Sequence, residues 1–146
     1  MVAGIAKLLL PGDTAPNLVL PSLKNPKYVF DQAAGRYIVL CFFHSARHAE
    51  SLDRLKFIHQ QTDLFDDVNF TFFGTTTDPQ DADQQRIAER YPGYRYFLDY
   101  EQNLSRLYGV AAEAGDENRP PYVPCWYVID PGMRVMTAIT FKRDGE

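Results

Sequence analysis

The chain has 146 residues, of which 45% are hydrophobic and 23% are charged, and its formal net charge is −4. This length and composition are typical of one globular domain spanning residues 1–146, not of a disordered chain. The negative charge, without any basic cluster, argues against a nucleic-acid partner and against an anionic membrane surface. The apolar stretch from Ile5 to Leu10 is too short to span a membrane and lacks the features of a signal peptide, so we expect a cytoplasmic protein.

The first half of the chain alternates between strand and helix patterns. Residues 18–20 form the first predicted strand. Residues 37–43 (YIVLCFF) are a continuous apolar run, which is typical of a central strand buried on both faces. A helix is predicted from Ala49 to about Thr62, because leucine and isoleucine recur there at helical spacing. A second buried strand, NFTFFGT, follows at residues 69–75.

The second half continues the alternation and ends in two adjacent strands. Asp78 followed by Pro79 is a helix start, and this helix is predicted to run to about Tyr91. The next elements in chain order are a strand at 94–98, a short helix at 102–108, a loop at 111–121, and strands at 125–129 and 134–141. The short turn at 130–132 joins the last two strands as a hairpin, which predicts an α/β domain with a mixed sheet.

Five phrases of the chain, in order, resemble one known family. They are GDTAPNL at 12–18, GRYIVLCFF at 35–43, TTD at 76–78, LYGV at 107–110 and YVIDPG at 127–132. Together they resemble the alkyl hydroperoxide reductase/thiol-specific antioxidant family, the peroxiredoxins, over nearly the whole chain. The resemblance implies a thioredoxin fold with a central mixed sheet of about five strands, helices on both faces and an N-terminal strand or hairpin extension.

The resemblance also locates the site where the family carries out its chemistry. The family motif P-x-x-x-T-x-x-C falls on His44, His48 and Ser51, and the position of its assisting arginine falls on Pro124. Peroxide reduction needs a nucleophile that is ionised near neutral pH and can become a sulfenic acid, which a serine hydroxyl cannot do. The resemblance to thioredoxin-like proteins further implies a cis Val123–Pro124 bond opposite this turn.

Ser51 could also be interpreted as the nucleophile of a hydrolase. His48 precedes it by one helical turn, but no acid in a matching motif completes a triad. We therefore predict that His48 and Ser51 are polar residues at a helix N-terminus.

The two cysteines and three histidines are the other candidates for chemistry. Cys41 lies inside YIVLCFF and is predicted to pack as a small apolar side chain, which leaves Cys125 as the candidate thiol near the altered site. A disulfide between them is not expected in a reducing compartment. His44, His48 and His59 do not have the spacing of a metal site, so no metal and no cofactor are expected.

The leading hypothesis is a catalytically degenerate peroxiredoxin-like domain that acts as a binding or scaffold module. The alternative is an antioxidant thiol oxidoreductase that uses Cys125 in a relocated site. The resemblance implies a closing helix after the last strand, which we expect to be missing or truncated here, and it extends to domains found ahead of iron/2-oxoglutarate oxygenases. A fused or partner catalytic domain and a homodimer are therefore the expected partners, and the sequence does not indicate the face involved.

Overall fold

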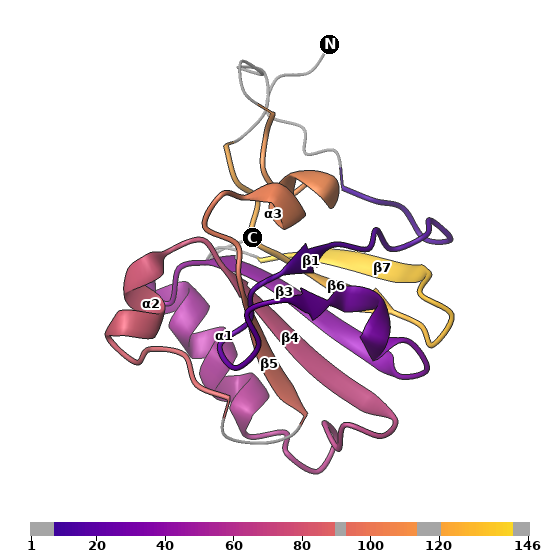
Figure 1. Ribbon diagram of the computed structural model, residues 1–146, viewed down its shortest axis with the longest axis horizontal. Coiled ribbons are helices and arrows are strands. Elements are labelled where there is room, and N and C mark those ends of the chain that lie inside the picture. Colours follow the sequence, from indigo (N-terminus) through magenta and orange to yellow (C-terminus); the bar gives the residue numbers. More distant parts are fainter. Residues whose placement is uncertain (1–7, 90–92, 114–120, 142–146) are drawn as a thin grey trace.

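The computed structural model describes residues 8–89, 93–113 and 121–141, which form a five-stranded sheet, a small N-terminal hairpin and short helices (Figure 1). The hairpin pairs β1 (Val19–Leu20) with β2 (Tyr28–Val29) and leads into a 3-10 turn, η1 (Phe30–Ala33). No helix among the described residues is long and apolar enough to cross a membrane.

The central sheet has the strand order β5-β4-β3-β6-β7. Its strands are β3 (Tyr37–His44), β4 (Phe70–Thr76), β5 (Tyr94–Leu98), β6 (Cys125–Ile129) and β7 (Val135–Thr140). β3, β4 and β5 are parallel, whereas β6 is antiparallel to both β3 and β7. The mixed sheet and the N-terminal hairpin predicted from the sequence are therefore confirmed.

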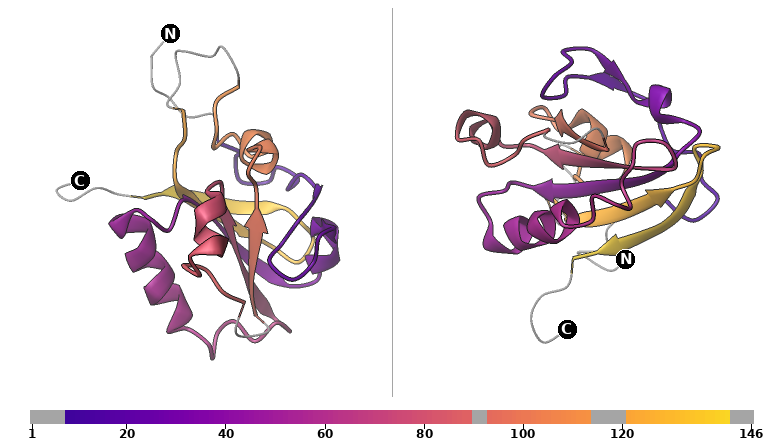
Figure 2. Two further views of the ribbon diagram at one scale, coloured as in Figure 1. Left: turned by 60° about the vertical axis from the view of Figure 1, so that its left-hand side comes forward. Right: turned by 90° about the horizontal axis from the view of Figure 1, so that it is seen from below.

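Two apolar clusters lie on opposite faces of this sheet. One face carries Phe42, Phe73 and Phe97, which pack with η1 and with α3 (Asn103–Leu107). The other carries Phe43, Phe72 and Tyr96, which pack with Leu55 and Ile58 of α1 (Ala49–His59). Figure 2 shows α1 on one side of the sheet and β1 and η1 on the other. Alternate residues of β3 thus enter different clusters, as expected for a strand buried on both faces.

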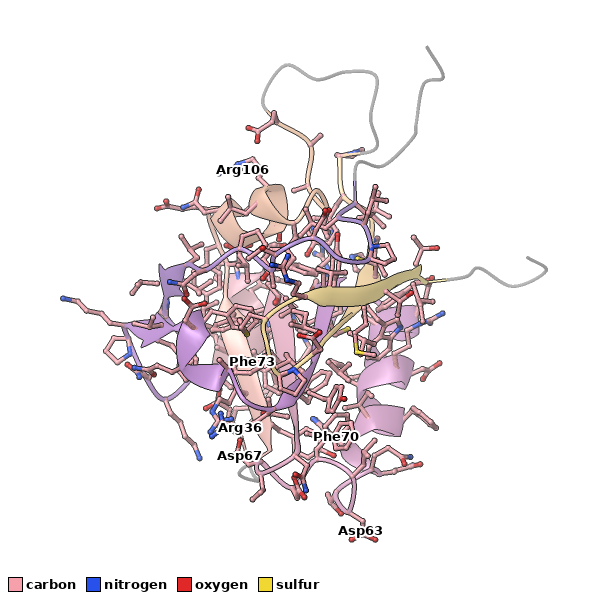
Figure 3. The ribbon with its side chains drawn as sticks, turned by 90° about the vertical axis from the view of Figure 1, so that its right-hand side faces the viewer. Arg36, Asp63, Asp67, Phe70, Phe73 and Arg106 are labelled. Carbon is pink, nitrogen blue, oxygen red and sulfur yellow. The ribbon has the colours of Figure 1, made fainter. Side chains whose placement is uncertain are left out.

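An ionic cluster lies at the end of the sheet where β3 and β4 begin. Asp67 accepts hydrogen bonds from Arg95 at 2.8 and 3.0 Å, and its carboxylate lies 3.7 Å from Nε of Arg36. Figure 3 shows Arg36 and Asp67 together near Phe70, with Arg106 of α3 at the opposite end of the molecule. This cluster is therefore remote from the carboxyl ends of the parallel strands, where ligands usually bind in open α/β sheets.

The helix predicted from Asp78 to about Tyr91 is much shorter than expected, because α2 covers only Pro79–Asp83. Asp78 caps it as predicted, by accepting a hydrogen bond from the N–H of Gln80 at 3.0 Å. The helix ends where Gln85 adopts a left-handed backbone with φ 56° and Arg86 turns back to form an ion pair with Asp81. This ion pair joins residues five positions apart, so a local side-chain contact accompanies the early end of the helix. Tyr91 lies outside the described residues.

Candidate functional site

The altered motif, which runs from His44 to Ser51, lies where β3 ends and α1 begins. His44 is the last residue of β3 and has a left-handed backbone with φ 69°, after an irregularity in the pairing with β4. Such a conformation costs about 1 kcal/mol or more for a residue with a Cβ. Both the N–H and the hydroxyl of Thr77 donate to the carbonyl of His44, at 2.9 and 3.1 Å, and so hold the bend in place.

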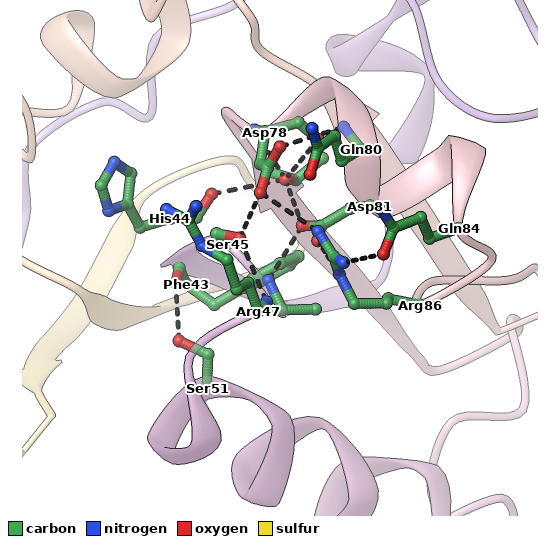
Figure 4. A network of polar contacts seen from close by, with 12 residues as sticks. Phe43, His44, Ser45, Arg47, Ser51, Asp78, Gln80, Asp81, Gln84 and Arg86 are labelled. Atoms are coloured by element: carbon green, nitrogen blue, oxygen red, sulfur yellow. Dashed lines mark hydrogen bonds and ion pairs between the residues drawn. The ribbon is translucent and has the colours of Figure 1, made fainter.

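A buried carboxylate fixes the loop that follows His44 (Figure 4). Asp81 accepts hydrogen bonds from the hydroxyl of Thr76 at 2.6 Å and from the N–H of Ala46 at 2.9 Å, and it forms an ion pair with Arg86 at 2.8 Å. Asp78 accepts from the hydroxyl of Ser45 at 2.6 Å, which is the main reason that the pKa of this carboxyl is lowered. The loop between β3 and α1 is therefore preorganised by α2.

Ser51 lies in the first turn of α1, as the sequence predicted, and its side chain points back at β3. It is 3% exposed, and its hydroxyl donates a hydrogen bond of 2.7 Å to the carbonyl of Phe43. His48 is the N-cap residue of α1 without a side-chain capping bond, and it forms no hydrogen bond with Ser51 in the described structure. A hydroxyl committed to a backbone carbonyl without a base is not an activated nucleophile.

The imidazole of His44 forms a stack that the sequence analysis did not predict. Its ring lies 4.4 Å from the Tyr122 ring and 5.7 Å from the His48 ring, with interplanar angles near 20° in both pairs. Burial, together with the neighbouring His48 and Arg47, lowers the pKa of His44 and so favours the neutral imidazole. His44 and Tyr122 are 78 positions apart, and no motif links them.

Tyr122 connects this stack to a buried carboxylate. Its hydroxyl lies 3.3 Å from Oγ of Ser105, which in turn donates to Asp99 at 2.7 Å. Asp99 also accepts from the backbone N–H groups of Leu104 and Ser105, so it serves as the anchor for α3. The described residues near the altered motif are thus joined by hydrogen bonds and ring stacking in a fixed arrangement.

The prediction of a cis Val123–Pro124 bond is wrong, because the described residues contain no cis peptide. Val123 and Pro124 instead form backbone hydrogen bonds to two other parts of the chain. The N–H of Val123 donates to Val110 at 2.8 Å, and the carbonyl of Pro124 accepts from Phe141 at 3.0 Å. Pro124 is half-buried and lies beside the strand end at Phe43, because the next residue, Cys125, pairs with Phe42.

Comparison with known proteins agrees with this architecture. The AhpC/TSA family model matches residues 11–138. This chain belongs to the AhpC/TSA family. A comparison with curated proteins by sequence gives no match.

Three solved structures illustrate how closely the fold of this AhpC/TSA domain is shared. The yeast mitochondrial 1-Cys peroxiredoxin superposes with a TM-score of 0.74 at 17% identity, covering 92% of this chain and 68% of the other. The peroxidoxin BcpB of Mycobacterium tuberculosis superposes with a TM-score of 0.71 at 20% identity, covering 90% of this chain and 85% of the other. The thiol peroxidase of Chromobacterium violaceum superposes with a TM-score of 0.72 at 14% identity, covering 96% of this chain and 81% of the other. At these identities the likeness shows the thioredoxin-like fold alone.

Both cysteines of this AhpC/TSA domain are free thiols in buried strand positions. Cys125 lies on the α3 side of the sheet and Cys41 on the α1 side, so they enter different apolar clusters. Burial raises the pKa of Cys125 to about 12 and also raises that of Cys41. The candidate thiol, Cys125, is paired with Phe42 near the start of the altered motif, but it is not open to solvent.

The three histidines do not converge. His44 and His48 stack, whereas Nε2 of His59 lies 2.7 Å from the Tyr96 hydroxyl on the α1 side of the sheet. Within the described ranges, no group of three or more His, Cys, Asp or Glu side chains could hold a metal ion. The histidines are thus explained by ring stacking and hydrogen bonding.

Proposed function

We propose that this AhpC/TSA domain is catalytically inactive as a peroxidase and acts as a binding or scaffold module. The observation that carries the proposal is the burial of both thiols, neither of which has an exposed fraction above 0%. The family and fold fit an active peroxidase equally well, so the decision rests on this local chemistry. A thiol with a pKa of about 12 is ionised in only about one molecule in 10⁵ at pH 7.

The first turn of α1 supports the same proposal. The family motif laid on this chain puts Ser51 where a reactive cysteine would stand, and the Ser51 hydroxyl donates to the Phe43 carbonyl. Pro124, at the proposed position of the assisting arginine, brings no charge. Arg86, in the segment after α2, is held in ion pairs with Asp78 and Asp81. On this proposal the site lacks a nucleophile that ionises near neutral pH.

An open apolar face supports the binding role. Trp126 of β6 and Ile139 of β7 are paired on the α1 side of the sheet. Ile139 is 51% exposed, and Phe57 on α1 is 61% exposed. Phe57 lies one turn after Arg54, whose guanidinium stacks 4.3 Å above Phe141, and it therefore lies on the same side of the helix. Large apolar side chains left exposed on one side of a domain favour an interaction site there.

This open face is where we propose that the module packs against a fused or partner catalytic domain. An iron/2-oxoglutarate oxygenase is the partner that the sequence resemblance favours, in a cytoplasmic setting. The second copy of a homodimer is the other candidate occupant. Sedimentation velocity distinguishes the two occupants. A monomer of 16.7 kDa would leave the face free for another domain. A dimer that dissociates in Ile139→Asp, but not in Leu107→Asp on α3, would assign the face to a second copy.

Activity is tested by peroxide consumption with a thiol reductant on the native protein, Cys125→Ser and Ser51→Cys. We expect the native protein and Cys125→Ser to be equally inert. Ser51→Cys restores the sulfur but leaves it buried beside the Phe43 carbonyl, which favours the protonated thiol, so we expect only a slow gain. Rapid turnover by the native protein that is abolished in Cys125→Ser would overturn the proposal and establish the relocated thiol site.

A further inference from the structure

A pocket of about 250 Å³ lies on the α1 side of the sheet, away from the altered motif. Its apolar walls come from Leu52 and Leu55 of α1, from Ile87 after α2, and from Tyr94 of β5. An apolar cavity of about 150 Å³ holds benzene, so this volume suits a ring or chain of roughly six to eight carbons. The pocket is therefore the size of a small organic molecule and not of a peptide.

The wall formed by the segment after α2 is held in place before any ligand arrives. Arg86 donates to Asp81 at 2.8 Å and to Asp78 at 3.2 Å, and its N–H donates to the carbonyl of Asp81 at 2.8 Å. Because Asp81 is itself fully buried, these bonds fix the left-handed turn at Gln85 and the position of Ile87. A preformed wall lowers the entropic cost of binding.

The floor of the pocket is also fixed by hydrogen bonds. The hydroxyl of Tyr94 donates to the carbonyl of Ile58 at 2.7 Å, and His59 contacts the Tyr96 hydroxyl at 2.7 Å. The His59 ring packs edge-on against Tyr94 at 5.2 Å. These contacts hold α1 against β5 and keep a polar ring beside the apolar walls.

The charges that line the pocket are of one sign. Lys56 and Arg86 contribute positive groups, and no Asp or Glu is among the described lining residues, although the chain as a whole carries a charge of −4. Arg86 is already paired with Asp78 and Asp81, whereas no ion pair involves Lys56 among the described residues. Lys56 is exposed on α1, so its ammonium group is available to an anion at the mouth.

We propose that this pocket binds a small organic monocarboxylate, with its apolar body between Leu52, Ile87 and Tyr94 and its carboxylate paired with Lys56. The apolar walls exclude a fully polar anion such as phosphate, and the positive mouth discriminates against amines. This site is separate from the altered motif and does not depend on the proposed loss of peroxidase activity.

The test is calorimetric titration of the native protein with octanoate and benzoate, alongside the matched alcohol and amine. We expect one of the two acids to bind with a Kd of about 1 mM or tighter. The alcohol is expected to bind at least about tenfold more weakly, and the amine not detectably. Backbone amide shifts in the ¹H–¹⁵N spectrum should change at Leu52 and Ile87.

Two variants separate charge from shape. Lys56→Gln should weaken the acid about tenfold and leave the alcohol unchanged, whereas Lys27→Gln, at an exposed site elsewhere, should change neither. Ala88→Phe, which fills the pocket, should abolish binding of both while its spectrum remains folded. Equal affinity for acid and alcohol, an unchanged Kd in Lys56→Gln, or shifts confined to another surface would each overturn the proposal. So would the absence of binding by both acids.

Discussion

The carboxylate of Asp81 is expected to be the most important single polar group for stability in this domain. In Asp81→Ala, the buried N–H of Ala46 and the hydroxyl of Thr76 lose their 2.9 and 2.6 Å partners, and Arg86 loses its 2.8 Å ion pair. Removing one partner of a buried ion pair costs about 3–5 kcal/mol, much of it from the groups left without a partner. Arg86 keeps its contact with Asp78, so we place the loss near the lower end of that range.

The measurement is urea unfolding of Asp81→Ala, followed by circular dichroism, together with thermal unfolding. A loss of about 3 kcal/mol corresponds to a fall in Tm of roughly 6–12 °C for a chain of this size. Asp83→Ala, an exposed carboxylate on the same helix, should stay within about 0.5 kcal/mol of the native protein. If Asp81→Ala unfolded within 1 kcal/mol of the native free energy, the account of the network as the anchor of the β3–α1 loop would be refuted.

Two further outcomes follow from the core and from the stack. Gly74→Ala should lose about 1–3 kcal/mol in urea unfolding, because the added Cβ would lie 2.5 Å from Tyr96, whereas Gly132→Ala, with 3.4 Å to its nearest neighbour, should lose far less. The pKa of His44, read by NMR titration, should lie below 6.5, because burial disfavours the imidazolium. The unfolded chain then binds the proton more readily than the folded chain, so this contribution to stability is present above pH 6.5 and is lost as the pH falls through the folded pKa. His44→Gln should not lose this stability on acidification. A steeper loss of stability in His44→Gln than in the native protein would contradict the lowered pKa of His44.

The strands could be predicted because their apolar runs leave few alternatives. YIVLCFF and CWYVI fill both faces of the sheet centre, and β5 and β6 have the predicted bounds. The resemblance implied an N-terminal strand or hairpin, but the residues of β2 and η1 were not predicted, because Tyr28 and Phe30 form them through long-range ring contacts with Phe73 and Phe97. Pairs of this kind have no signature in the local sequence.

The candidate site was predictable only in its local part. The positions of His48 and Ser51 at the start of α1 follow from the helical pattern, and the structure confirms them. Tyr122 and Asp81 could not be found in this way, because each meets the β3–α1 loop across 35 or more positions of the chain. The early end of α2 has a local origin instead, since Arg86 turns back to pair with Asp81, five positions earlier.

The pairing of β3 with β6 places the two native thiols on opposite faces of the sheet. Cys125 stands opposite Phe42, so it shares a face with that ring, whereas Cys41, one residue earlier, points to the other face. A one-residue difference in a strand reverses the side of the sheet, which places a layer of backbone between the two sulfur atoms and prevents a disulfide without moving a central strand. Exposing Cys125 would require displacing the packing around Phe42 and Tyr127, and exposing Cys41 would require lifting α1. The burial of both thiols therefore follows from the packing on the two faces of the sheet.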